Sequence, residues 1–201
     1  MINNILSVVL CLCLISLIYM IAFTLTRYQS RKRIPFIALL GVIFLTVLGY
    51  LLEITAKTPD GGFVAVKLLY ASLMFLPVVY LVFITTFCEV KLSKVVIGIL
   101  LVSASAVSAL IWTTDTHGLI YTSIGYATNV PIHHITTVKG DAFLIMHAFP
   151  LLCVVISLVI LLNRLMTWNK KYRINIVLLL IGLLLPVLIN ILYLFQSTFM
   201  E

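Results

Sequence analysis

Six long apolar segments, separated by more polar connections, account for most of this chain. A helix needs about 20 predominantly apolar residues to cross the roughly 30 Å of hydrocarbon in a bilayer, and each segment is close to that length. Backbone polar groups in lipid must be satisfied within the segment, which favours helices. The pattern therefore predicts one all-α membrane domain over residues 1–201, a polytopic bundle of six transmembrane helices. The predicted spans are Ile5–Leu25, Ile34–Leu52, Phe63–Phe87, Val95–Trp112, Phe143–Leu165 and Ile174–Phe195.

The connection between the fourth and fifth spans, residues 113–142, is much longer than the others. Two stretches within it, Leu119–Tyr126 and Ile132–Val138, are rich in β-branched and aromatic residues, and Thr128-Asn129-Val130-Pro131 between them suits a turn. This combination is typical of a β-hairpin. A loop of this length in a compact domain usually has a function, so we expect a small hairpin or lid over one face of the bundle.

Composition and charge place the chain in a membrane and orient it there. Hydrophobic residues make up 63% of the chain, charged residues 9%, and the mean hydropathy is +1.25, which excludes an ordinary soluble domain. The net charge is +7, and ten of the thirteen basic residues lie in the connections after spans one, three and five. Basic residues in short loops mark the cytoplasmic side, so the N-terminus is expected outside. These loops also suit anionic lipid, and nucleic-acid binding is not predicted.

Polar and ionisable side chains within the spans are candidates for a functional site, because burying them in a bilayer is costly. At 1.5 Å of helix rise per residue, those of this chain fall in the outer half of the bundle. They suggest a polar pocket that opens outward; the alternative is that Glu53 and Lys67 simply pair and the tyrosines form an interfacial belt. The candidate ligand-binding residues, including one from the long loop, are Glu53, Lys67, Tyr70, His117, His147, Asn190 and Tyr193.

Five of these candidates have an expected role. Glu53 and Lys67 would form a charge network for which a ligand could compete, His117 and His147 would shape or sense the outer mouth, and Asn190 would hydrogen-bond within the bundle. The histidines near the outer face, which also include His133 and His134, are poorly spaced for a zinc site, and no cysteine joins them. No metal or cofactor is therefore predicted, and hydrogen-bonding histidines are favoured over pH sensors. Motifs such as H-E-x-x-H and G-x-S-x-G are missing from the sequence, so no enzymatic activity is predicted.

A series of short motifs links the chain to a known family. In order, they are Tyr50-Leu-Leu-Glu53, Lys67-Leu-Leu-Tyr70, Phe75-Leu-Pro77, Thr113-Thr-Asp-Thr-His117-Gly-Leu119-Ile-Tyr121, Gly140-Asp-Ala-Phe143 with His147, and Tyr172-Arg173 before a helix with Pro186, Asn190 and Tyr193. Through them, roughly from Ile34 to Phe195, the chain resembles the N-terminal seven-transmembrane-helix input region of bacterial sensor histidine kinases, which also precedes diguanylate cyclase modules. Asp115 and Gly118 occupy variable or altered positions of the family pattern Thr-Asn-x-x-His-x-Leu-x-aromatic.

The resemblance implies a multi-pass sensor of the bacterial inner membrane. Such a region would detect an extracytoplasmic small ligand or an envelope condition and relay it to a cytoplasmic histidine kinase or cyclase module. It also implies a seventh helix, so the chain is expected to be a truncated product or a piece of a longer receptor. The expected partners are the lipid bilayer, an unknown outer ligand, the output module and a second copy in a homodimer. A small transporter or permease component is the alternative, although its pathway would need polar groups near the midplane.

Overall fold

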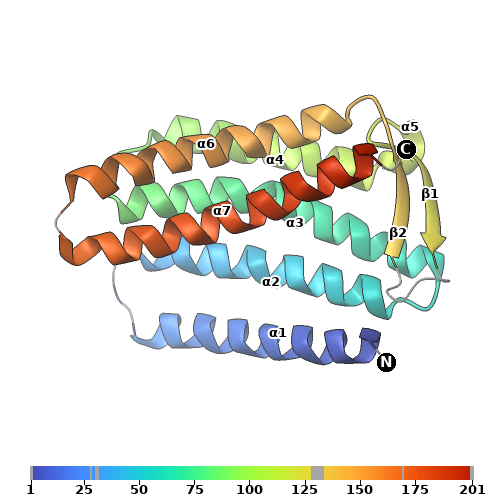
Figure 1. Ribbon diagram of the computed structural model, residues 1–201, viewed down its shortest axis with the longest axis horizontal. Coiled ribbons are helices and arrows are strands. Elements are labelled where there is room, and N and C mark those ends of the chain that lie inside the picture. Colours follow the sequence, from blue (N-terminus) through green and yellow to red (C-terminus); the bar gives the residue numbers. More distant parts are fainter. Residues whose placement is uncertain (1, 28, 30–31, 128–133, 169, 200–201) are drawn as a thin grey trace.

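The protein is a bundle of long helices with a small β-hairpin at one end (Figure 1). The computed structural model describes residues 2–27, 29, 32–127, 134–168 and 170–199. The long helices are α1 (Ile2–Arg27), α2 (Arg33–Thr55), α3 (Pro59–Phe87), α4 (Lys94–Trp112), α6 (Phe143–Thr167) and α7 (Lys170–Phe199). The single turn α5 (Thr114–His117) follows α4, and the strands β1 (Tyr121–Ala127) and β2 (His134–Lys139) lie between α5 and α6.

Five helices, α1 to α4 and α6, are long and apolar enough to cross a membrane within the described residues. The part of α7 whose side chains the structure describes contains an apolar stretch, Arg173–Leu188. The predicted polytopic helical membrane fold is therefore confirmed for five of its six spans. The sixth crossing and the orientation of the bundle stay predictions.

Helix α3 lies at the centre of the bundle, because it packs against α2, α4 and α6, while α1 packs on α2 and α7 on α6. The local sequence sets where α3 begins. The Thr58 hydroxyl oxygen accepts a hydrogen bond from the Gly61 N–H at 3.2 Å, and Pro59 follows at the first helical position. A proline there loses little, because that N–H has no partner within the helix.

The buried apolar residues form three clusters along α3. The cluster under the hairpin contains Met74, Ile111, Ile120, Tyr121 and Met146. The middle cluster contains Val78, Leu81, Ala104 and Cys153. The third, at the opposite end, contains Ile84, Cys88, Leu161, Ile176, Leu180 and Leu183. We call the end that carries β1 and β2 the hairpin end and the opposite end the basic end.

Helices α2 and α3 approach each other closely near the hairpin end. A Cβ added to Gly49 would lie 2.8 Å from the backbone nitrogen of Leu69. One turn away, the hydroxyls of Thr46 and Ser72 are 3.0 Å apart. Small residues permit such backbone approach between membrane helices. The antiparallel register of these contacts places Glu53, one turn further along α2, at nearly the same depth as Lys67 of α3.

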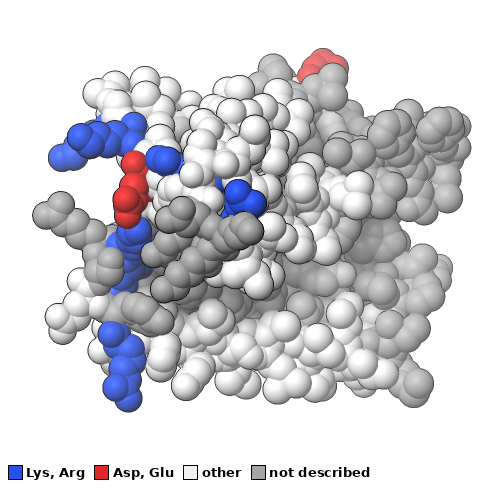
Figure 2. Space-filling view, turned by 60° about the vertical axis from the view of Figure 1, so that its left-hand side comes forward, with Lys and Arg blue, Asp and Glu red and all other residues white. Residues whose placement is uncertain are grey.

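Lysine and arginine side chains gather at the basic end, which is turned toward the viewer on the left of Figure 2. This end is formed by the connections from α1 to α2, from α3 to α4 and from α6 to α7 (Figure 1). The described basic residues there are Arg27, Lys32, Arg33, Lys91, Lys94, Arg164 and Arg173. The fold therefore brings onto one face the charges that the sequence distributes over three connections.

Helix α3 ends at this face in a strained turn. The Val90 N–H bonds to the Thr85 carbonyl and the Glu89 N–H to the Thr86 carbonyl, the pair of bonds of a Schellman motif. Glu89 takes the left-handed position, with φ 57°, which usually belongs to glycine. Its carboxylate accepts a hydrogen bond from Lys32 at 3.0 Å, so the strained residue ties the α3–α4 connection to the start of α2.

Exchanging Glu89 for glycine and for glutamine should separate strain from charge. Both variants lose the ion pair, but only Glu89→Gly relieves the left-handed backbone, so its thermal midpoint should exceed that of Glu89→Gln by about 2–4 °C.

Lys32, through its hydrogen bond and its charge, holds the pKa of the Glu89 carboxyl below its usual value. The ion pair therefore stabilises the protein at neutral pH, and this contribution is lost as the pH falls through the lowered pKa. Melting curves that rank the variants the other way would contradict the strain.

Candidate functional site

A buried lysine at the hairpin end is paired with a loop aspartate. The Nζ atom of Lys67 lies 2.5 Å from the Oδ2 atom of Asp115 and 4.2 Å from the centroid of the Phe63 ring, one turn earlier on α3. The Lys67 side chain is 9% exposed and that of Asp115 is 52% exposed. The pair therefore joins the central helix of the bundle to the surface, with a cation–π contact supporting the ammonium.

The turn α5 places Asp115 over Lys67. Thr114 is buried and its carbonyl accepts a hydrogen bond from the Gly118 N–H at 2.9 Å, while its hydroxyl accepts one from the Tyr121 N–H at 3.3 Å. Gly118 ends the turn with φ 61°, a left-handed conformation that glycine adopts at no steric cost. The position of Asp115 is therefore set by the backbone of α5 as well as by its ion pair with Lys67.

Backbone hydrogen bonds join the two ends of the hairpin beside α5. The Gly140 N–H bonds to the Ile120 carbonyl at 2.8 Å and the Ala142 N–H to the Leu119 carbonyl at 2.9 Å. A Cβ on Gly140 would lie 2.3 Å from the Leu119 carbonyl oxygen. No side chain fits between these backbones, so the loop that carries Asp115 and the start of α6 are in direct contact.

A row of aromatic rings connects α3 to α6 beneath the hairpin. The Tyr70 and Tyr121 ring centroids are 5.9 Å apart, those of Tyr121 and Phe143 are 6.2 Å apart, and those of Phe143 and His147 are 4.4 Å apart. The His147 Nδ1–H donates to the Phe143 carbonyl at 3.0 Å. Edge-to-face and offset contacts at these spacings are favourable, and they link two predicted site residues, Tyr70 and His147, through β1.

His117 is held by hydrogen bonds at both ring nitrogens. Its Nδ1 accepts from the Leu119 N–H at 3.0 Å, and its Nε2 lies 3.1 Å from the Thr113 hydroxyl oxygen. That hydroxyl donates to the Ala109 carbonyl at 2.8 Å. The proton of the imidazole therefore lies on Nε2, and the ring stabilises the turn that carries Asp115.

The predicted site residues come together in part. Glu53 is buried at the end of α2, and the ion pair described for Lys67 is the one with Asp115 rather than one with Glu53. Asn190 and Tyr193 belong to α7, but the structure does not describe their side chains. His133 and the side chain of His134 are likewise outside the described part of the chain. Within the described residues, no group of three His, Cys, Asp or Glu side chains could hold a metal ion.

Sequence reasoning missed Asp115, Tyr121 and Phe143 as members of the site. One signal could have identified Asp115. Asp115 lies three residues after Trp112, the end of the fourth predicted span. It is therefore expected at about the same membrane depth as Lys67. The two aromatic residues carry no such signal, because aromatic rings at a bilayer interface are common.

A known protein family matches nearly the whole chain. The family model described as the N-terminal 7TM region of histidine kinase matches residues 5–201. No curated protein and no solved structure matches the chain. The match includes all the site residues described above.

Proposed function

The chain belongs to the family of N-terminal 7TM regions of histidine kinases, and from that premise we propose that it detects a small ligand or an envelope condition at its hairpin end. A region of this family is a membrane sensory input region and not a catalytic domain. In our proposal the chain crosses a bacterial inner membrane six times, with its N-terminus and hairpin outside. The basic end then faces the cytoplasm, in agreement with the charge rule for short loops, and reports to a cytoplasmic kinase module.

The ion pair between Lys67 and Asp115 is the observation that carries this proposal. An anionic group of a ligand could replace Asp115 at the Lys67 ammonium and so release α5 from the bundle. Signalling requires two conformations with different affinity for the ligand, and in this proposal the paired loop and a released loop would be those two states. Glu53, at nearly the depth of Lys67, and Tyr70, one turn further along α3, would contact the ligand or adjust the mouth, as would His117 and His147 beside the loop. Asn190 and Tyr193 are proposed to join them from α7.

A transporter is the less favoured alternative, because the buried and half-buried polar groups described near the centre of the bundle are hydroxyls that hydrogen-bond to backbone carbonyls: Ser108 to Ala71, Ser157 to Cys153 and Tyr80 to Leu179. The middle cluster consists of Val78, Leu81, Ala104 and Cys153. Transporters place their substrate and ion sites near the bilayer midplane. Measured flux of a solute into vesicles that contain the chain would support this alternative.

The function can be tested in the receptor that joins this region to its kinase module. Asp115→Asn and Lys67→Met should each change the basal kinase output, by up to about tenfold for a coupling of about 1.4 kcal/mol. The double variant should behave like either single variant, because all three lack the same ion pair. The readout is kinase autophosphorylation in membranes, normalised to inserted protein.

Asp60→Asn is the matched control, since Asp60 is an exposed acidic residue in the first turn of the same central helix. It should leave the output unchanged. If both single variants insert normally and signal as the unmodified receptor does, the ion pair has no part in sensing and the proposed site is wrong.

A further inference from the structure

A cavity of about 540 Å³ opens between α1, α2 and α3 near the basic end. This volume is within the range of small-molecule sites. The cavity lies at the opposite end of α3 from Lys67, so the proposed sensory site does not account for it. Four phenylalanines form much of its wall, and two cationic residues also line it: Phe23, Phe36, Phe83, Phe87, Lys32 and Arg33.

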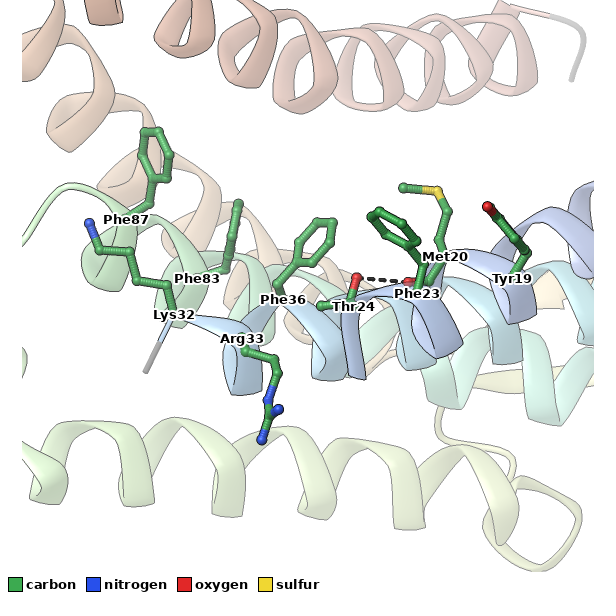
Figure 3. A pocket seen from close by; sticks show the side chains of 9 residues that line it. All are labelled: Tyr19, Met20, Phe23, Thr24, Lys32, Arg33, Phe36, Phe83 and Phe87. Carbon is green, nitrogen blue, oxygen red and sulfur yellow. Dashed lines mark hydrogen bonds between the residues drawn. The ribbon is translucent and has the colours of Figure 1, made fainter. Parts of the chain in front are cut away.

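The wall of this cavity is apolar. Figure 3 shows the four phenylalanine rings projecting to the same side, with the Lys32 ammonium at the end of the row beside Phe87. The centroids of Phe36 and Phe83 are 5.6 Å apart, and those of Phe83 and Phe87 are 6.1 Å apart. The hydroxyl of Thr24, which also lines the cavity, donates to the Met20 carbonyl at 2.7 Å, so it adds little polarity to the wall.

The mouth of the cavity is cationic. The Lys32 ammonium lies 5.9 Å from the Phe87 ring centroid, and Phe87 contacts the Trp168 ring, over which Arg164 lies at 5.7 Å. Glu89 neutralises part of this charge through its ion pair with Lys32. Arg33 also lines the cavity, but its side chain is directed to the opposite side from the phenylalanine rings (Figure 3) and donates to the Leu25 carbonyl at 3.3 Å, so it adds positive charge to this end without lying beside the rings. Because the Lys32 side chain is about half exposed, an anion can reach it from outside.

The cavity runs along the helices. On α1 its lining extends from Thr24, near the basic end, to Tyr19; at 1.5 Å per residue this is a length of about 7.5 Å. A charged mouth above an apolar slot parallel to the helix axes matches an anionic headgroup above an acyl chain. Basic pockets between membrane helices are known to take anionic lipid headgroups.

We propose that this cavity binds an anionic phospholipid, with its phosphate at Lys32 and one acyl chain against the four phenylalanine rings. Lipid of this class would hold α1 against α2 and α3. Because Lys32 is also bonded to Glu89 at the strained end of α3, bound lipid would act directly on the connection from α3 to α4. The site does not depend on the sensory proposal, since it uses other residues at the other end of the bundle.

Tryptophan fluorescence can test this proposal, because Trp168 contacts Phe87 of the cavity wall. The other tryptophan, Trp112, lies at the end of α4, and Trp112→Phe leaves Trp168 as the reporter. The protein is reconstituted in phosphatidylcholine bilayers that contain a small fraction of phosphatidylglycerol with brominated acyl chains. Half-maximal quenching of Trp168 should need about tenfold less brominated phosphatidylglycerol than brominated phosphatidylcholine. Lys32→Gln with Arg33→Gln should remove most of this preference.

Lys91→Gln with Lys94→Gln is the matched control, because it removes two charges from the same end but neither residue lines this cavity. It should retain the preference for phosphatidylglycerol. Equal quenching by both brominated lipids in the unmodified protein would overturn the proposal without any variant. Protection of Trp168 from both lipids that grows with protein density would overturn it too, since a helix of a second copy would then fill the cavity.

Discussion

Gly140→Ala is expected to lower the free energy of unfolding at the hairpin end by about 3 kcal/mol. A Cβ at this position would lie 2.3 Å from the Leu119 carbonyl oxygen and 2.6 Å from the Gly118 carbonyl oxygen. Both contacts are with backbone, so no side-chain rotation can relieve them. The hairpin ends must separate, and the hydrogen bond from the Gly140 N–H to the Ile120 carbonyl is weakened. Unfolding by denaturing detergent, together with amide hydrogen exchange at residues 119–121 and 140–142, measures the effect.

Gly98→Ala is the control for this substitution, because an added Cβ on Gly98, within α4, meets no atom within 4 Å. Alanine there should leave the stability unchanged or raise it by up to about 1 kcal/mol. Gly140→Ala should also change kinase output in the same direction as Asp115→Asn does. The reason is that the start of β1, which would move away from Gly140, directly follows the turn that carries Asp115. Unchanged exchange at both strand ends would contradict the close backbone contact.

The helices could be predicted from the sequence because membrane spans depend on long apolar runs, which need no knowledge of tertiary contacts. Helix α4 begins at Lys94 and ends at Trp112, one residue from the predicted start. Helix α3 begins at Pro59, four residues before the predicted Phe63. Its first turn is polar and is defined by the Thr58 cap, a local signal that hydropathy alone does not contain.

The site could be predicted only as far as membrane depth determines it. Depth identified Lys67 and placed Glu53 at its level. Asp115 lies at a similar depth, and the choice between the two carboxylates depends on the left-handed turn at Gly118 and on the contact with Gly140. These are tertiary features of a loop, and neither apolar periodicity nor the position of a span specifies them.

The cavity at the basic end escaped prediction for a different reason. Its phenylalanines occur in three separate spans, where aromatic side chains are expected to face lipid or other helices. Only the packing of α1 on α2 brings Phe23 to the same slot as Phe83. The strain at Glu89 is likewise invisible in the sequence, because glutamate is an ordinary residue in a loop.

Gly49→Ala is expected to destabilise the bundle by about 3 kcal/mol, because α2 and α3 touch at this glycine. The added Cβ would lie 2.8 Å from the nitrogen and 2.9 Å from the Cα of Leu69. The helices must move apart, which also lengthens the hydrogen bond between Thr46 and Ser72. Unfolding in denaturing detergent, followed by circular dichroism, measures the change. Leu69 lies between Lys67 and Tyr70, so the displacement occurs at the proposed site itself.

Gly41→Ala makes the comparison decisive, because Gly41 belongs to the same helix and an added Cβ there meets no atom within 4 Å. Alanine has the higher helix propensity, so Gly41→Ala should stabilise by up to about 1 kcal/mol while Gly49→Ala destabilises. Opposite signs within one helix can come only from packing; stabilisation by both would mean that α2 does not touch α3 at Gly49. The displacement at Leu69 should also disturb the ion pair between Lys67 and Asp115. Asp115→Asn should therefore change the free energy of unfolding less in the Gly49→Ala protein than it does alone, as expected for coupled neighbours.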